Sequence, residues 1–171
     1  MRLHAVGYGT RMHAPDLIRT AITRLEGATR LDAQTERLGG VAAAVASPSR
    51  APALRGDWLG HALHPLLTDL PLGCWISAGL LDLVGGKGSR KASQRLIGLG
   101  LLFVPPTAAS GLAEYEGLER PATRRVGLVH GVGNTLVASL YFVSWRSRRA
   151  GRHGRGVLLG LAAGGLAWGT G

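Results

Sequence analysis

The chain has 171 residues, a formal net charge of +10 and one cysteine, and 46% of its residues are hydrophobic. This length suits one compact domain with a modest extension. The basic residues fall between apolar runs instead of gathering on one predicted face, which excludes a nucleic-acid partner. Because Cys74 has no second cysteine, one chain cannot build a disulfide or a thiolate metal site.

Residues 1–56 predict an N-terminal segment in front of the main domain. From Pro15 to Gly39-Gly40 the pattern predicts an amphipathic helix. Its expected apolar side consists of Leu17, Ile18, Ala21, Ile22, Leu25 and Ala28. The helix is expected either on the membrane surface or packed on the ends of a helical bundle, since both placements bury the same stripe. The Gly-, Pro-, Ser- and Arg-rich stretch 47–56 predicts a connector.

Four uncharged stretches follow, at 70–81 (inside a longer apolar run, 66–84), 96–113, 126–145 and 157–171. Lipid offers no partner for an unpaired backbone N–H or C=O, so only helices and closed barrels span it, and these runs are too long for barrel strands. We therefore predict an all-α integral membrane protein. Residues 57–171 are expected to form a four-helix bundle with spans at about 64–84, 95–114, 125–146 and 156–171.

Two features of these spans predict how the helices behave. Pro105-Pro106 should kink or locally open the second span, because proline removes backbone donors. Gly156, Gly160 and Gly164 recur every fourth residue in the fourth span and predict close packing on another helix.

The distribution of Lys and Arg predicts the orientation in the membrane. The loops after the first and third spans hold nine Lys and Arg residues, whereas the segments on the opposite side hold five. The positive-inside rule then places the first and third loops in the cytoplasm and both termini outside.

Successive spans cross the membrane in opposite directions, so residues near the start of one span and the end of the next lie at the same level. Six polar residues are expected at one such level near the outer face: His61, His64, Asp69, Glu114, His130 and Asn134. Ionisable groups at membrane depth usually face the protein interior, and three interpretations of this set stay open. The first is haem b held by His64 and His130, with His61 in reserve. The second is a non-haem metal bound by His61, His64, Asp69, Glu114 and His130. In the third, the histidines are structural, with His64 capping the first span and His130 bonding Asn134 or a backbone carbonyl.

Asp82 belongs to a different part of the molecule, because thirteen residues of helix separate it from Asp69 by roughly 20 Å. With Lys87 and Arg95 nearby in sequence, it is interpreted as a structural, interfacial ion pair. No Ser-His-Asp order, phosphate-binding glycine loop or Cys-x-x-Cys motif occurs. No catalytic residue is predicted, and a non-enzymatic role is favoured.

The segments WLGHALHPLLTDLPLGCW (58–75), LDLVGG (81–86), TAASGLAE (107–114) and VHGVGN (129–134) resemble a bacterial family of small four-span membrane proteins, DUF2231, a domain of unknown function. Members commonly have proline after the first histidine, where this chain has Ala62. The resemblance implies a multi-pass protein of the bacterial cytoplasmic (inner) membrane. Some relatives carry a Rieske iron–sulfur domain after the last span, which implies a membrane anchor or an electron-transfer partner.

These observations lead to two functional hypotheses. The first is a redox-associated membrane subunit, with the lipid bilayer, a Rieske-type or other redox protein, and further copies of the chain as expected partners. The second is a non-catalytic membrane scaffold or assembly subunit, in which the histidines only hold helices together.

Overall fold

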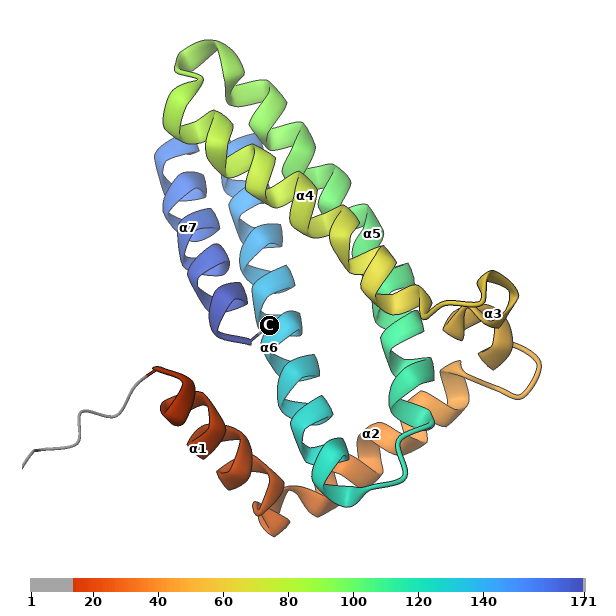
Figure 1. Cartoon of the computed structure of the whole chain (residues 1–171). Helices are drawn as coiled ribbons and strands as arrows, with labels where there is room; N and C mark the ends of the chain where they lie inside the picture. The colour runs from red at the N-terminus through yellow and green to blue at the C-terminus, as the bar shows by residue number, and fades with distance from the viewer. Residues whose placement is uncertain (1–13, 171) are drawn as a thin grey trace, which may run out of the picture.

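The computed structural model describes residues 14–170, and of residues 14–17 and 170 it describes the backbone alone. The predicted contributions of residues 1–13, the Leu17 side chain and Gly171 therefore lie outside the described part. Within it, the predicted all-α class is confirmed (Figure 1). The helices are α1 (Ala14–Glu26), α2 (Asp32–Val45), α3 (Ala51–Arg55), α4 (Leu63–Val84), α5 (Arg90–Glu116), α6 (Pro121–Arg149) and α7 (His153–Thr170).

Three helical stretches of the described chain are long and apolar enough to cross a membrane: α4, the stretch Lys87–Glu116 that contains α5, and α6. The fourth predicted span falls on α7, which is 18 residues long and is not among the three. Each stretch contains an apolar segment of 18 residues, and only 17 to 22% of that segment is buried inside the protein. Most of the surface of these helices therefore faces outwards. Such apolar helices indicate contact with a lipid bilayer.

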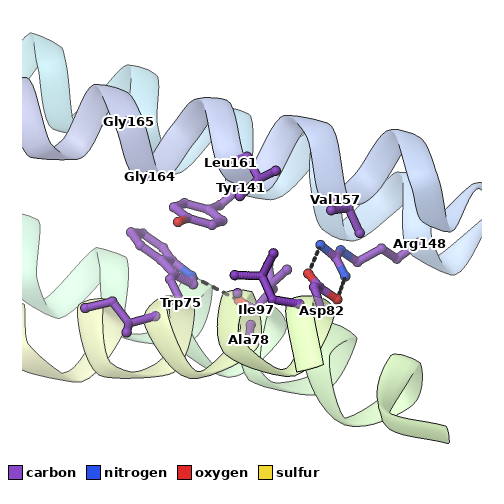
Figure 2. A pocket seen from close by; sticks show the side chains of 14 residues that line it. Trp75, Ala78, Asp82, Ile97, Tyr141, Arg148, Val157, Leu161, Gly164 and Gly165 are labelled. Carbon is purple, nitrogen blue, oxygen red and sulfur yellow. Dashed lines mark hydrogen bonds and ion pairs between the residues drawn. The ribbon is translucent and has the colours of Figure 1, made fainter. Parts of the chain in front are cut away.

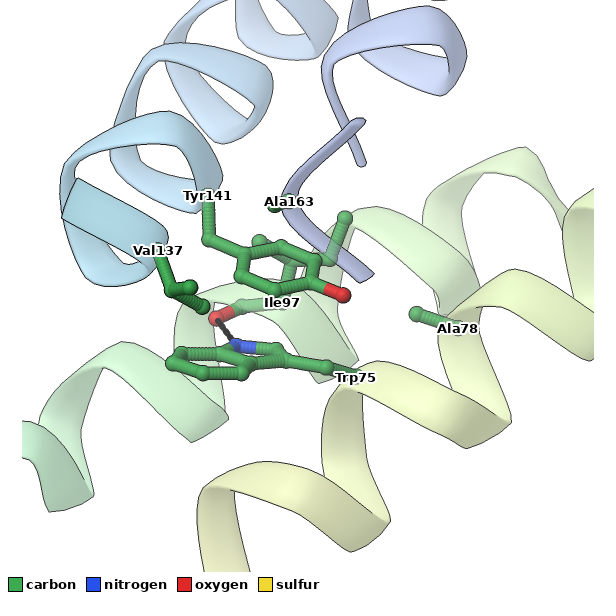
Figure 3. Close-up of a cluster of buried hydrophobic side chains, with 6 residues drawn as sticks. All are labelled: Trp75, Ala78, Ile97, Val137, Tyr141 and Ala163. Atoms are coloured by element: carbon green, nitrogen blue, oxygen red, sulfur yellow. Dashed lines mark hydrogen bonds between the residues drawn. The ribbon is translucent and has the colours of Figure 1, made fainter. Parts of the chain in front are cut away.

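The four long helices form two antiparallel hairpins, α4 with α5 and α6 with α7 (Figure 1). The hairpins meet in the half of the molecule that holds the α4–α5 and α6–α7 connections and diverge towards the other end. Their shared core consists of Trp75, Ala78, Ile97, Val137, Tyr141 and Ala163 (Figure 3). The Trp75 and Tyr141 rings stack with centroids 4.1 Å apart, and Trp75 Nε1 donates to the Ile97 carbonyl at 3.4 Å. This aromatic stack joins the two hairpins.

The double proline does not open α5, which continues through Pro105 and Pro106 as one helix. Thr107 Oγ1 lies 2.7 Å from the Phe103 carbonyl oxygen and 3.2 Å from that of Leu67 on α4. The carbonyl of Leu67 is the one that Pro71, four residues later in α4, leaves without an N–H donor, so the Thr107 hydroxyl supplies a partner across the two helices. Of the predicted kink or local opening, the opening is wrong, because the helix is continuous through both prolines.

The N-terminal segment is not the single helix expected up to Gly39-Gly40. It breaks after Glu26, passes a short 3-10 turn (Thr29–Leu31), and resumes as α2, which runs through both glycines to Val45. Helix α2 lies across the ends of α5 and α6 at the diverging end of the molecule (Figure 1). The Tyr115 hydroxyl donates to the Thr35 carbonyl at 3.3 Å. Of the two expected placements, α2 therefore adopts the packed one.

Candidate functional site

An ion pair buried in the protein joins the last turn of α4 to the last turn of α6. Arg148 donates from Nη2 to Asp82 Oδ2 at 2.7 Å and from Nη1 to Asp82 Oδ1 at 2.8 Å (Figure 2). The Arg148 side chain is 1% exposed and that of Asp82 is 6% exposed. This bidentate geometry is the strongest form of a carboxylate–guanidinium contact, and it offsets much of the cost of removing both charges from water.

Two serines satisfy the remaining polar atoms of this ion pair. Ser93 at the start of α5 donates to Asp82 Oδ1 at 2.7 Å and accepts from Arg148 Nη1 at 2.9 Å. Ser144, one turn before Arg148, accepts from Arg148 Nε at 3.3 Å. Both hydroxyls are completely buried. A buried polar network stabilises a fold only when its members are satisfied, and these side chains satisfy one another.

The start of α7 closes the network. Ser144 Oγ donates to the Gly156 carbonyl at 2.6 Å, and a Cβ on Gly156 would lie only 2.5 Å from Arg148 Cγ. Glycine is required there because the two backbones approach so closely. His153 Nε2 lies 3.7 Å from Asp82 Oδ1. Burial, followed by the charge of Arg148, lowers the pKa of His153, so a neutral imidazole covers the pair at neutral pH.

The sequence interpretation of Asp82 as an ion pair with Lys87 or Arg95 named the wrong partner. The carboxylate faces the bundle interior and meets Arg148, 66 residues away, instead of the nearby surface cations. Sequence reasoning also missed Ser93, Ser144 and His153. A signal was present in α6, where four buried residues recur at helical spacing: Val137, Tyr141, Ser144 and Arg148. An arginine in phase with core positions indicates a buried partner.

The predicted ligand His64 packs against α5. Its Nδ1 lies 3.0 Å from the Thr107 carbonyl oxygen, so this nitrogen carries the proton and donates. A Cβ on Gly111 would lie 2.8 Å from His64 Cε1, which means that the ring rests on the glycine. His64 therefore links α4 to α5, and the prediction that it caps the first span is wrong, because its ring reaches the neighbouring helix and no side chain of the described residues caps the start of α4.

The remaining predicted site residues take separate places. His130 is exposed, and Asn134 Nδ2 lies 2.8 Å from its Nε2, as the structural interpretation expected. His61 is exposed with Nδ1 3.1 Å from the Ala62 carbonyl oxygen, and Asp69 is also exposed. Glu114 Oε1 is buried without a hydrogen-bond partner among the described atoms. No three His, Cys, Asp or Glu side chains within the described residues gather as metal ligands would. The haem pair and the metal set stay predictions.

A cavity of about 260 Å³ lies beside the Asp82–Arg148 pair, between α4, α6 and α7 (Figure 2). Trp75, Ile97 and Tyr141 line its inner part, and Leu161 and Gly164 contribute from α7. The cavity is mainly apolar, with the ion pair at one end and the hydroxyl-bearing ring of Tyr141 in its lining. A carboxylate and a guanidinium that saturate each other leave neither group available as a base, nucleophile or ligand.

The model of a family described as predicted membrane protein (DUF2231) matches residues 60–170. The chain belongs to the DUF2231 family. No curated protein and no solved structure matches it. The DUF2231 region contains helices α4 to α7 and with them the Asp82–Arg148 network, the cavity and the predicted histidines, whereas α1 to α3 precede it. The features described above are therefore part of the family's own domain.

Proposed function

We propose that this DUF2231 protein is a non-catalytic scaffold or assembly subunit of the bacterial cytoplasmic membrane, with four spans that include α7. The observation that carries the proposal is the saturation of the Asp82–Arg148 network by side chains of α4, α5 and α6 together with a backbone carbonyl of α7. A polar network completed from within favours one rigid arrangement of helices over binding or proton transfer. The broad apolar exterior then serves to contact lipid and other membrane proteins.

The role of His64 tests this proposal. If its ring only ties α4 to α5, His64→Ala lowers the stability of a colourless, metal-free protein by about 1 kcal/mol, the net worth of one hydrogen bond. Thermal unfolding in detergent measures the loss. His61→Ala is the matched control, because His61 is exposed and its ring bonds only the adjacent residue.

One observation favours a second candidate, the redox-associated subunit with haem b or a non-haem metal. Donation from His64 Nδ1 to a backbone carbonyl leaves Nε2 with a free lone pair, which is the usual orientation of a metal-binding histidine. His130 fits this role less well, because the Asn134 amide occupies its Nε2 lone pair and would have to turn away. A Rieske-type or other redox protein, or a second copy of the chain, would be the partner.

Absorbance and metal analysis of the purified protein separate the two candidates. A Soret band or a stoichiometric metal that disappears in both His64→Ala and His130→Ala would establish the redox candidate and reject the scaffold. His153→Ala serves as control, since His153 lies at the opposite end of the hairpins, beside Asp82. A spectrum without a cofactor band, together with a destabilised His64→Ala variant, is the result expected of the scaffold.

A further inference from the structure

The cavity between α4 and α7 opens to the outer side of the helices. Three apolar residues on its rim, Ile76, Leu83 and Leu161, are 62%, 69% and 52% exposed. Trp75 lines its inner part and is only 7% exposed. Apolar cavities of this kind exclude water and accept hydrocarbon. In a lipid-facing position, the available hydrocarbon is an acyl chain.

The charged end of the cavity lies at a strongly basic end of the molecule. The Lys and Arg residues exposed around the α4–α5 and α6–α7 connections are Lys87, Arg90, Lys91, Arg95, Arg146, Arg149, Arg152 and Arg155. No acidic residue occurs in 85–113 or in 120–171. The one carboxylate at this end, Asp82, is already neutralised by Arg148. The positive charge at this end is therefore uncompensated by acidic residues of the two connections.

We propose that the cavity holds one acyl chain of an anionic phospholipid whose headgroup rests on these basic residues. Basic pockets between membrane helices on the cytoplasmic side are suited to anionic headgroups, and the positive-inside rule assigns this end to the cytoplasm. Neither the apolar cavity nor the basic end selects this ligand alone; together they match its two chemically different parts. The inference depends on membrane embedding and not on the role of the histidines.

Quenching of Trp75 by brominated lipid tests the proposal. In a variant with Trp58, Trp145 and Trp168 replaced by Phe, Trp75 is the remaining fluorophore, and its burial shields it from bulk lipid. Brominated phosphatidylglycerol diluted into unlabelled phosphatidylcholine is compared with brominated phosphatidylcholine diluted into unlabelled phosphatidylglycerol. We expect at least about fivefold tighter binding of the anionic lipid, the contribution of one basic residue near the membrane surface.

Two pairs of variants locate the site. Gly79→Leu fills the cavity from α4, where a Cβ meets nothing within 4 Å, and should abolish the quenching. Gly131→Leu, at an equally open position on α6 outside the cavity, should leave it unchanged. Changing Lys87, Arg90 and Lys91 to Gln should remove the preference for the anionic lipid. The same change at Arg19, Arg30 and Arg37, exposed residues of the N-terminal segment, should preserve it.

Equal quenching by the two brominated lipids, or full quenching in Gly79→Leu, would overturn the proposal. If the chain forms a dimer and the dimer is not quenched, the occupant of the cavity is a second copy of the chain, and the lipid proposal is rejected. A haem or metal found at His64 would not change the quenching of Trp75 by lipid. The lipid proposal and the proposed scaffold function can therefore fail independently.

Discussion

Asp82 and Arg148 neutralise each other at a place where either charge alone would be costly. Their side chains are almost fully buried. Ser93 and Ser144 form further hydrogen bonds with the carboxylate and with the guanidinium Nε, respectively. The energetic value of such a pair is asymmetric: the intact pair contributes little net stability, whereas an unpaired member is strongly destabilising. This asymmetry gives a direct test of the network.

We expect Asp82→Asn and Arg148→Met each to lower the free energy of unfolding by about 3–5 kcal/mol, because each leaves a buried group without its partner. The double variant should lose much less than the sum of the two. Chemical unfolding in detergent, followed by tryptophan fluorescence, measures the cycle. Arg146→Met, at an exposed position in the same turn of α6, is the control and should change stability little. Additive losses would show that the two side chains do not act as a pair.

Helices α6 and α7 approach each other closely along the glycine stripe, but the three glycines differ in how tightly they are held. A Cβ on Gly156 would lie 3.0 Å from the Ser144 carbonyl oxygen as well as against Arg148, whereas the nearest atom to a Cβ on Gly164 is Tyr141 Oη at 3.5 Å. At Gly160 the nearest atoms are 3.6 Å away, in ordinary contact. The stripe belongs to α7 and packs against α6, with its critical position, Gly156, beside the ion pair.

Gly156→Ala should therefore destabilise the protein by about 1–3 kcal/mol, the usual cost of forcing a methyl group into a packed contact. Gly164→Ala should be neutral, or stabilising by up to about 1 kcal/mol, because alanine favours the helix and fits the space. Thermal unfolding of the two variants side by side measures the difference. Equal effects would mean that α7 does not pack on α6 in the described register.

At the scale of the whole molecule, a second charged contact fastens the N-terminal helices to the membrane domain. Arg125, near the start of α6, bonds Asp32 Oδ1 from Nε at 2.7 Å and Oδ2 from Nη2 at 3.1 Å, and it also donates to the Glu26 carbonyl. This one guanidinium holds both the end of α1 and the beginning of α2. Helix α2, held in this way, lies across the end of α5 and the start of α6 (Figure 1).

The bond to Arg125 lowers the pKa of Asp32 below its ordinary value of 3.8. A carboxyl whose pKa is depressed in the folded state stabilises the fold above the ordinary pKa and loses this contribution as the pH falls through the folded-state value. Hydrogen exchange of α2 amides, corrected for the intrinsic effect of pH, should therefore rise only below about pH 3.8. Asp32→Asn should show raised exchange already at neutral pH, whereas Glu36→Gln, an exposed neighbour, should behave as wild type. A pH-independent exchange rate in both proteins would contradict this role.

The membrane topology predicts which positions a membrane-impermeant maleimide reaches in a Cys74→Ala background. Gly88→Cys, in the α4–α5 connection, should react from the cytoplasmic side, and Glu119→Cys, in the α5–α6 connection, from the outside. Gly169→Cys near the end of α7 decides whether the fourth span exists. A Cβ there meets nothing within 4 Å, and reaction from the outside is expected. Reaction of Gly169→Cys from the cytoplasmic side would reduce the protein to three spans.

The sequence by itself determined that the long apolar segments face lipid, and it determined the secondary structure of most of the chain. Long uncharged runs can only be helices in lipid, so the expected spans fall within α4, α5, α6 and α7 over their described residues. The bond between His130 and Asn134 was also predictable, because residues four apart on a helix share a face. The break after Glu26 and the continuation through Gly39-Gly40 were not, since the contact between Arg125 and Asp32 that holds the ends of α1 and α2 is distant in sequence.

Only the tertiary structure decided which polar groups of different helices meet. Asp82 could be read as a surface ion pair because Lys87 and Arg95 are its near neighbours in the chain, and local spacing contains no information about a partner 66 residues away. The crossing of the two hairpins brings Arg148 to it, and the depth of that crossing excludes water and makes the pairing obligatory. Helical periodicity fixes which side of one helix faces inward, whereas the rotation and offset between helices choose the atoms that touch.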